Sequence, residues 1–145
     1  ERRPRFEASD EQRRRLAERF FAAARDDDLR ALEELLAEDV ELHGDGGGKV
    51  PALARPLSGR ARVVKALGAW LKVGARLGIE LRPTEVNGQP GAVLALGDGS
   101  LVSVMALDIA DGQVRAIRSV ANPDKIDHLG PVADYREALR RLRSR

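Results

Sequence analysis

The sequence lacks cysteine altogether, and only 3% of its 145 residues are aromatic. The absence of cysteine excludes a disulfide framework, a thiolate nucleophile and a cysteine-based zinc site. Two histidines make a poor set of metal ligands, so we expect neither a metal nor another cofactor. Because aromatic side chains are scarce, Leu, Val, Ile and Ala must build most of the core.

Long apolar runs are also missing. No segment approaches the roughly 18 apolar residues that a membrane span needs, and no signal peptide is recognisable, so we expect a cytoplasmic protein without membrane contacts. What is present, 43% hydrophobic and 33% charged residues, is typical of a globular domain. A length of 145 residues suffices for one domain with one sizeable core.

Positive charge is concentrated at the two ends of the chain, although the net charge is only +2. The arginines in these clusters are Arg2, Arg3, Arg5, Arg13, Arg14 and Arg15, and then Arg136, Arg140, Arg141, Arg143 and Arg145. Such clusters are usually solvated helix faces, and contact with DNA is the alternative. No aromatic residues are interleaved with them, which argues against specific reading of nucleic acid. The start at Glu1, without methionine, suggests a fragment of a longer protein.

Two helices are predicted at the start of the chain. Ser9 and Gln12 form a capping box, so the first helix is expected over about residues 10–25. The three aspartates 26–28 end it and supply negative charge to the start of a second helix. Leucines at helical spacing within residues 29–36 give that second helix one apolar stripe.

A strand, a loop and a third helix should follow. Val40 and Leu42 alternate with polar residues, which predicts a short strand. Residues 44–59 are rich in glycine and proline and predict a loop, with room for a short strand near residues 54–57. Ser58 can cap the third helix, expected over about residues 60–77.

The second half of the chain has the pattern of an antiparallel meander. Asn87-Gly88, Asp98-Gly99 and Asp111-Gly112 are tight-turn signals about a dozen residues apart. Runs rich in Val, Leu and Ile separate them, over residues 79–86, 91–97, 100–109 and 113–121. A final amphipathic helix could use Val132, Tyr135, Leu139 and Leu142.

Helices followed by long strands predict an α+β fold. A strongly twisted antiparallel sheet wrapped around three helices would make a cone with one open mouth and a pocket between sheet and helices. This order of elements resembles the nuclear-transport-factor-2-like superfamily, and within it the SnoaL-like domains. Residues 27–40, which read DDLRALEELLAEDV, are similar to the second helix and following strand of those domains.

Two further strings narrow the resemblance. Residues 43–49 read HGDGGGK and residues 122–126 read NPDKI. A DGGGK loop paired with an NPDKL motif is the pattern of one subgroup of extracytoplasmic-function (ECF) sigma factors, which carry a SnoaL-like domain behind their sigma regions. The strings VNGQPG at residues 86–91 and IRSV at 117–120 are similar to the same subgroup, and the likeness covers about residues 4–129. Ile126 replaces the usual Leu, a swap that conserves volume.

The resemblance implies a regulatory domain and not an enzyme. It divides the chain into a linker from absent sigma regions at residues 1–9, the SnoaL-like domain at 10–129, and a basic C-terminal tail at 130–145 that is expected to be helical. The implied partners are the protein's own sigma regions and the linker between them, and through these RNA polymerase and promoter DNA. A small-molecule ligand and a homodimer of the isolated chain are further expectations.

The implied contact residues form two motifs. The contact loop is Asp45, Gly46, Gly47, Gly48 and Lys49, and the contact motif is Asn122, Pro123, Asp124, Lys125 and Ile126. A flexible surface loop without a role is the alternative for the first, and a plain strand-to-helix corner is the alternative for the second. The first is no phosphate loop, because His43 stands where the Walker pattern needs glycine and Val50 follows the lysine.

An enzyme remains the main alternative, because relatives of this fold include isomerases, cyclases and hydrolases that use a pocket carboxylate or histidine. The candidate residues are Asp39, Glu41, His43, Asp45, Asp108 and Arg118. Asp108 and Arg118 each alternate with apolar residues, so each lines a pocket or reaches out from the sheet. Together with Trp70 they are the possible pocket residues.

Overall fold

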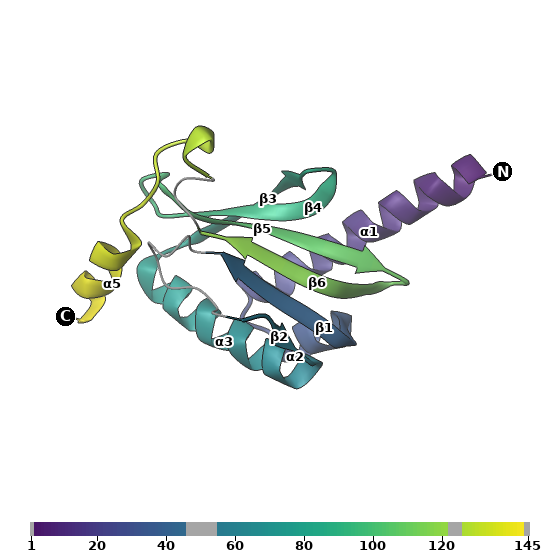
Figure 1. Cartoon of the computed structure of the whole chain (residues 1–145), viewed down its shortest axis with the longest axis horizontal. Coiled ribbons are helices and arrows are strands. Elements are labelled where there is room, and N and C mark those ends of the chain that lie inside the picture. Colours follow the sequence, from purple (N-terminus) through teal and green to yellow (C-terminus); the bar gives the residue numbers. More distant parts are fainter. Residues whose placement is uncertain (1, 46–54, 122–125, 144–145) are drawn as a thin grey trace.

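The computed structural model describes residues 2–45, 55–121 and 126–143 (Figure 1). The elements, in chain order, are α1 Arg2–Arg25, α2 Leu29–Leu35, β1 Leu36–Asp45, β2 Leu57–Ser58, α3 Arg60–Leu77, β3 Glu80–Val86, β4 Gln89–Ala95, β5 Leu101–Ala110, β6 Gln113–Val120, the 3-10 helix η1 Asp127–Leu129 and α5 Tyr135–Arg143. The predicted α+β class and its order of elements are confirmed.

One curved, open sheet of six strands has the order β2-β1-β6-β5-β4-β3 (Figure 1). β3 to β6 form the predicted antiparallel meander. The expectation of a purely antiparallel sheet is wrong, because β1 lies parallel to β6, from Glu41 beside Ala116 to Asp45 beside Val120. This pairing joins segments about 75 residues apart, and it extends β1 well beyond the short strand predicted around Val40.

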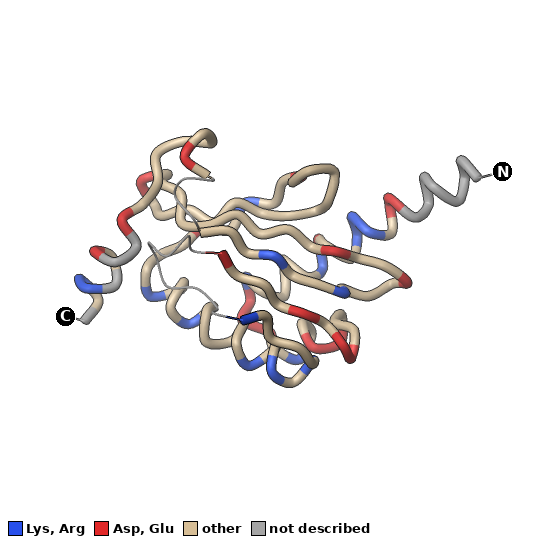
Figure 2. Tube along the Cα trace, in the orientation of Figure 1, with Lys and Arg blue, Asp and Glu red and all other residues tan. Residues whose placement is uncertain are grey.

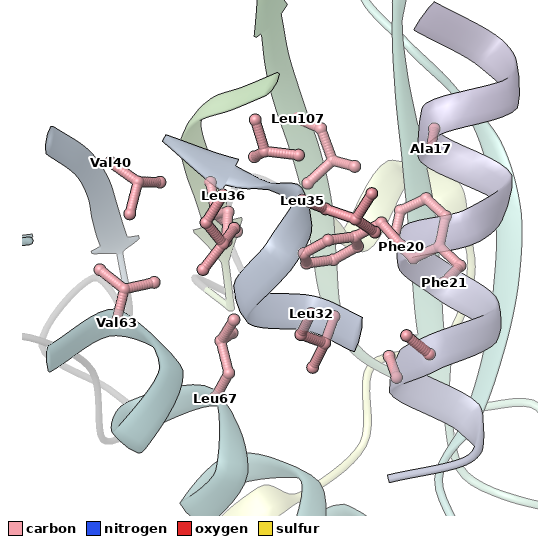
Figure 3. Close-up of a cluster of buried hydrophobic side chains, with 14 of the residues drawn as sticks. Ala17, Phe20, Phe21, Leu32, Leu35, Leu36, Val40, Val63, Leu67 and Leu107 are labelled. Atoms are coloured by element: carbon pink, nitrogen blue, oxygen red, sulfur yellow. The ribbon is translucent and has the colours of Figure 1, made fainter. Parts of the chain in front are cut away.

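All three N-terminal helices contribute to the main core, on one face of the sheet. Figure 3 shows its side chains converging from α1, α2, α3, β1 and β5. Phe20 and Phe21 meet edge to face at 5.4 Å between ring centroids, a favourable aromatic arrangement. Since no polar side-chain atom of the described residues is buried without a hydrogen-bond partner, this core carries no unpaired polar group.

A second, smaller cluster lies on the opposite, outer face of the sheet. Its buried members are Ala95, Leu101, Val104 and Ile126. The chain after β6 returns to cover this end of the sheet, where the Leu101 N–H donates to the Pro131 carbonyl and the Ala133 N–H donates to the Leu101 carbonyl. The C-terminal segment is therefore paired, through Val132, with the edge of β5 at its first residue.

Two predicted helix starts are wrong. The capping box at Ser9 is not a boundary, because α1 already begins at Arg2 and continues through it. Ser58 lies in β2, and the residue that precedes α3 is Gly59, at φ 101° and without a side-chain cap. The expected start of the second helix is confirmed, since the Asp28 carboxylate accepts a hydrogen bond of 3.1 Å from the Ala31 N–H.

The tight turns occur where they are predicted. Asn87-Gly88 and Asp111-Gly112 have positive φ at both residues, as hairpin turns that match strand twist require. The C-terminal helix, α5, lies beside α3, and Val132 precedes it, paired with Leu101. None of the helices within the described ranges is long and apolar enough to cross a membrane.

Candidate functional site

The two predicted contact motifs begin from neighbouring strands. β1 ends at Asp45 and β6 ends at Val120, and these residues are paired in register. One residue later, the Ala121 N–H donates a hydrogen bond of 2.7 Å to the Asp45 carbonyl. Residues 46–49 and 122–125 lie outside the described residues. The described chain therefore places the first residue of the contact loop next to the residue that precedes the contact motif.

Ile126, the last residue of the contact motif, is an anchor in the outer cluster. Its side chain is only 2% exposed and packs in the cluster with Ala95, Leu101 and Val104. A leucine would fill this buried position as well as the isoleucine does, which agrees with the replacement of the usual Leu by Ile126. At this position the packing explanation is sufficient, because the side chain is not available to a partner.

Asp108 and Arg118 do not lie where a pocket was expected. They form a hydrogen-bonded chain, in which the Arg118 Nε donates to Asp108 Oδ2 at 3.2 Å and the Gln89 amide donates to the other carboxylate oxygen. Their strand neighbours Leu107 and Ile117 point into the main core, so Asp108 and Arg118 point to the outer face. The correct alternative is that both side chains reach out from the sheet.

The other candidates for catalysis also lie on the outer face of the sheet or at the surface. His43 Nε2 lies 3.1 Å from Glu41 Oε1, and His43 is paired in register with Arg118. The carboxylate of Asp39 lies 3.4 Å from the Arg115 guanidinium. The residues described include no group of three or more acidic or histidine side chains that could hold a metal ion.

A cavity of about 840 Å³ opens on the helix side of the sheet, between the ends of α1 and α3 and the strands β3 to β5. Of the three predicted pocket residues, Trp70 lines it and Asp108 and Arg118 do not. The carboxylates in its lining belong to Asp27 and Glu80, which are both exposed. No histidine is among the lining residues.

The basic residues of this cavity were not predicted. They are Arg25, Lys72, Arg76 and Arg82. The helical spacing of Lys72 and Arg76 was a usable signal, because residues four apart share one face of a helix. Nothing in the sequence indicated that β3 would bring Arg82 to the same opening.

A second hollow of about 730 Å³ lies between α1 and the β3–β4 hairpin. Side chains of both charges line it, among them Glu11, Arg13, Arg14 and Glu85. Its mixed charge favours no particular class of ligand.

The register of the sheet relates these features to one another. One line of paired residues crosses five strands and joins Asp45, Val120, Val104, Val93 and Arg82. Since neighbouring strands lie about 4.8 Å apart, four spacings separate Asp45 from the cavity residue Arg82 by roughly 19 Å along the sheet. Both features are therefore at the same end of the sheet.

Comparisons with known proteins agree with this fold. A family model described as the SnoaL-like domain matches residues 17–121. Over 114 residues the chain is 34% identical to the ECF RNA polymerase sigma factor SigJ of Mycobacterium tuberculosis. The matched region covers 74% of the chain and 36% of SigJ. The chain thus spans little more than a third of that relative. The predicted resemblance to the SnoaL-like domain of an ECF sigma factor is confirmed.

Solved structures give the same result. The crystal structure of SigJ matches with a TM-score of 0.62 and 27% identity, covering 86% of the chain and 47% of SigJ. A candidate ketosteroid isomerase of Kribbella flavida matches with a TM-score of 0.56 and 26% identity, covering 76% and 77%. An NTF2-like protein of Cytophaga hutchinsonii, 11% identical with a TM-score of 0.51 and 77% and 90% covered, shares the fold. The match over residues 17–121 shows that the chain belongs to the SnoaL-like domain family.

Proposed function

We propose that the chain is the regulatory C-terminal domain of an ECF sigma factor and that it acts in the cytoplasm on the sigma regions of its own polypeptide. Its 34% identity to SigJ supports an ECF sigma factor as the parent protein. Because the match covers only 36% of SigJ, the parent protein has room for separate sigma regions. In this role the domain takes the place of a separate anti-sigma protein.

The observation that carries the proposal is the hydrogen bond between the Ala121 N–H and the Asp45 carbonyl. This bond places the described residues from which the two motifs continue beside each other, so the motifs can contribute to one composite surface. The burial of Ile126 supports this arrangement, because the described residues on both sides of residues 122–125, Ala121 and Ile126, lie against the sheet. We infer that residues 45–49 and 122–125 contact the sigma regions and the linker between them.

The partners of the domain are then the sigma regions directly, and RNA polymerase and promoter DNA through them. Regulation follows if docking of the composite surface changes how the sigma regions engage polymerase. A homodimer of the isolated chain stays a separate prediction, which sedimentation velocity of the chain at several concentrations would test.

The test uses the full-length parent protein in promoter-specific transcription with purified polymerase. One variant replaces Gly46, Gly47 and Gly48 by alanine, and a second combines Asn122→Ala with Asp124→Ala. We expect both to change the transcript yield, in the same direction, because both disturb one surface.

Two matched controls accompany these variants. Glu38→Ala removes an exposed charge at the start of β1, and Ile126→Leu restores the residue that is usual in the motif. Neither should change the yield. If the loop variants also transcribe like the parent protein, the contact role of both motifs is wrong.

A catalytic domain is the second candidate, and the likeness to the Kribbella flavida protein supports it. The cavity offers the exposed carboxylates of Asp27 and Glu80, and Glu80 is held by Arg82 at 2.8 Å. Both side chains are exposed and Glu80 is ion-paired, whereas a general base that abstracts a proton from carbon works in a site that excludes water. We therefore expect no isomerisation of a β,γ-unsaturated ketosteroid, and turnover that is lost in Asp27→Asn or Glu80→Gln would replace the regulatory proposal by an enzymatic one.

A further inference from the structure

The cavity on the helix side of the sheet has an apolar wall. Of its lining residues, those that form this wall include Phe20, Leu32, Leu67, Trp70, Leu94 and Met105. Trp70 and Leu94 are only partly buried, so apolar surface faces the cavity. A volume of about 840 Å³ lies within the range of pockets that enclose drug-sized ligands.

This cavity lies beside the main core and shares a wall with it, since Phe20, Leu32 and Met105 belong to both. The space under β1, β5 and β6 is filled by side chains such as Leu36, Leu42, Leu107 and Ile117, all fully buried. None of these lines the cavity, which instead lies toward β3 and the C-terminal half of α3. A ligand could therefore enter without displacing the packed centre of the domain.

The mouth of the cavity is basic. Four basic residues are among its lining residues, together with the acidic residues Asp27 and Glu80. Figure 2 shows that Lys and Arg recur along α3. Lys72 and Arg76 are exposed, stand one turn apart, and have no side-chain partner within the described part of the chain.

Arg25 adds a charge that pairs with no carboxylate among the described residues. Its guanidinium donates to the Leu81 carbonyl at 3.2 Å, whereas Arg82 is paired with Glu80. Basic residues in the last turn of a helix complement its dipole, which accounts for Arg25 and Arg76. Lys72 lies outside the last turn of α3, so the helix dipole does not account for its positive charge at the cavity.

We propose that this cavity binds a free amphipathic acid, whose apolar body lies against Trp70, Leu94 and Met105 and whose carboxylate is held by Lys72 and Arg76. Apolar walls favour burial of a hydrocarbon body, and cationic side chains at an opening favour an anionic group that stays near water. The proposal does not depend on the sigma-factor role, because it concerns binding by this chain alone.

The test titrates the full 145-residue chain with dodecanoate and with dodecan-1-ol, both below their aggregation limits. Trp70 is the only tryptophan in the sequence, so its fluorescence reports on the cavity without a label, and calorimetry gives an independent affinity. Dodecanoate should bind about tenfold or more tightly than the alcohol, because a charge-assisted contact is stronger than a neutral one. Its affinity should fall as salt is added.

Two sets of variants locate the site. The double variant Lys72→Met, Arg76→Met keeps the apolar stems but removes the charges, and should weaken dodecanoate about tenfold or more while leaving the alcohol unchanged. Arg62→Met, Lys65→Met is the matched control, with the same loss of charge on the same helix outside the cavity lining. It should leave both affinities unchanged.

Gly74→Leu fills the cavity from α3 and should abolish binding of both compounds, with circular dichroism showing that the fold is kept. Equal affinity for the acid and the alcohol would overturn the ligand class. Undiminished binding of dodecanoate in Gly74→Leu, or equal losses in the two charge variants, would overturn the site.

Discussion

The two faces of the sheet differ most at the end where β6 stops. On the inner face, Leu81, Leu94 and Met105 leave open a cavity of about 840 Å³. On the outer face, the neighbouring residues Val93 and Val104 belong to a closed cluster around Ile126. The same two strands therefore present an open surface on one side and a packed one on the other.

This difference shows how alternate residues of one strand can serve unrelated purposes. Side chains next to each other in the sequence point to opposite faces, so Met105 lines the cavity while Val104 packs in the outer cluster with Ile126. The two layers are separated only by the backbone of β4 and β5. Substitutions on either face test whether the open and the closed side respond as their packing requires.

The largest effect is expected on the closed side, from Ile126→Ala. Removal of a side chain that is 2% exposed should lower the free energy of unfolding by about 2–5 kcal/mol, since a cavity replaces its contacts. Urea denaturation measures this. Leu129→Ala is the control, because Leu129 is 53% exposed and its loss should cost less than about 0.5 kcal/mol. Equal costs would mean that Ile126 is not an anchor.

Gly91→Ala should destabilise by about 1–3 kcal/mol through overpacking. A Cβ atom at this position would lie 2.3 Å from the Met105 carbonyl oxygen and 2.7 Å from Val86 Cγ2, and backbone cannot move aside as a side chain can. Thermal unfolding followed by circular dichroism checks it. An unchanged melting temperature would show that the hairpin of β3 and β4 adjusts more freely than its contacts suggest.

Gly74→Ala, on the open side, should have the opposite sign. Its Cβ atom would make ordinary contacts of 3.8 Å and 3.9 Å with Ile79, and Gly74 lies inside α3. Since glycine is a poor helix former, alanine should raise the free energy of unfolding by about 0.4–1 kcal/mol. Urea denaturation of this variant beside Gly91→Ala gives the direct comparison. A loss of stability would mean that the cavity wall around Gly74 is more tightly packed than these contact distances indicate.

The smallest effect concerns Asp98, in the turn that joins β4 to β5. Hydrogen bonds from the Ser100 hydroxyl and then the Ser100 N–H, at 2.5 Å and 2.9 Å, lower the pKa of this carboxyl. Because its folded pKa lies below the unfolded value, the stabilisation is present above the unfolded pKa and is lost as the pH falls through the folded one. In Ser100→Ala the pKa of Asp98 should rise, as carboxyl NMR titration would measure. An unchanged pKa would contradict the role of the hydroxyl.

The candidate site was only partly predictable. The alternation of residues placed Asp108 among apolar neighbours, but it did not indicate which face of β5 the helices cover. In the structure Asp108 lies on the outer face, beside Arg118. Trp70 was predicted because the spacing of apolar residues in its helix was clear. Arg82 was missed because the start of β3 comes to line the same cavity as α3 only in the folded chain.

Local chemistry determined much of this protein. The turn residues at Asn87-Gly88 and Asp111-Gly112 and the cap at Asp28 fix where several elements begin or end, because each depends on residues only a few positions apart. Tertiary structure decided the parallel pairing of β1 with β6, and with it the contact between Asp45 and Ala121. A strand carries no local signal for a partner some 75 residues away, so the pairing of Asp45 with Val120 depends on how the whole sheet assembles.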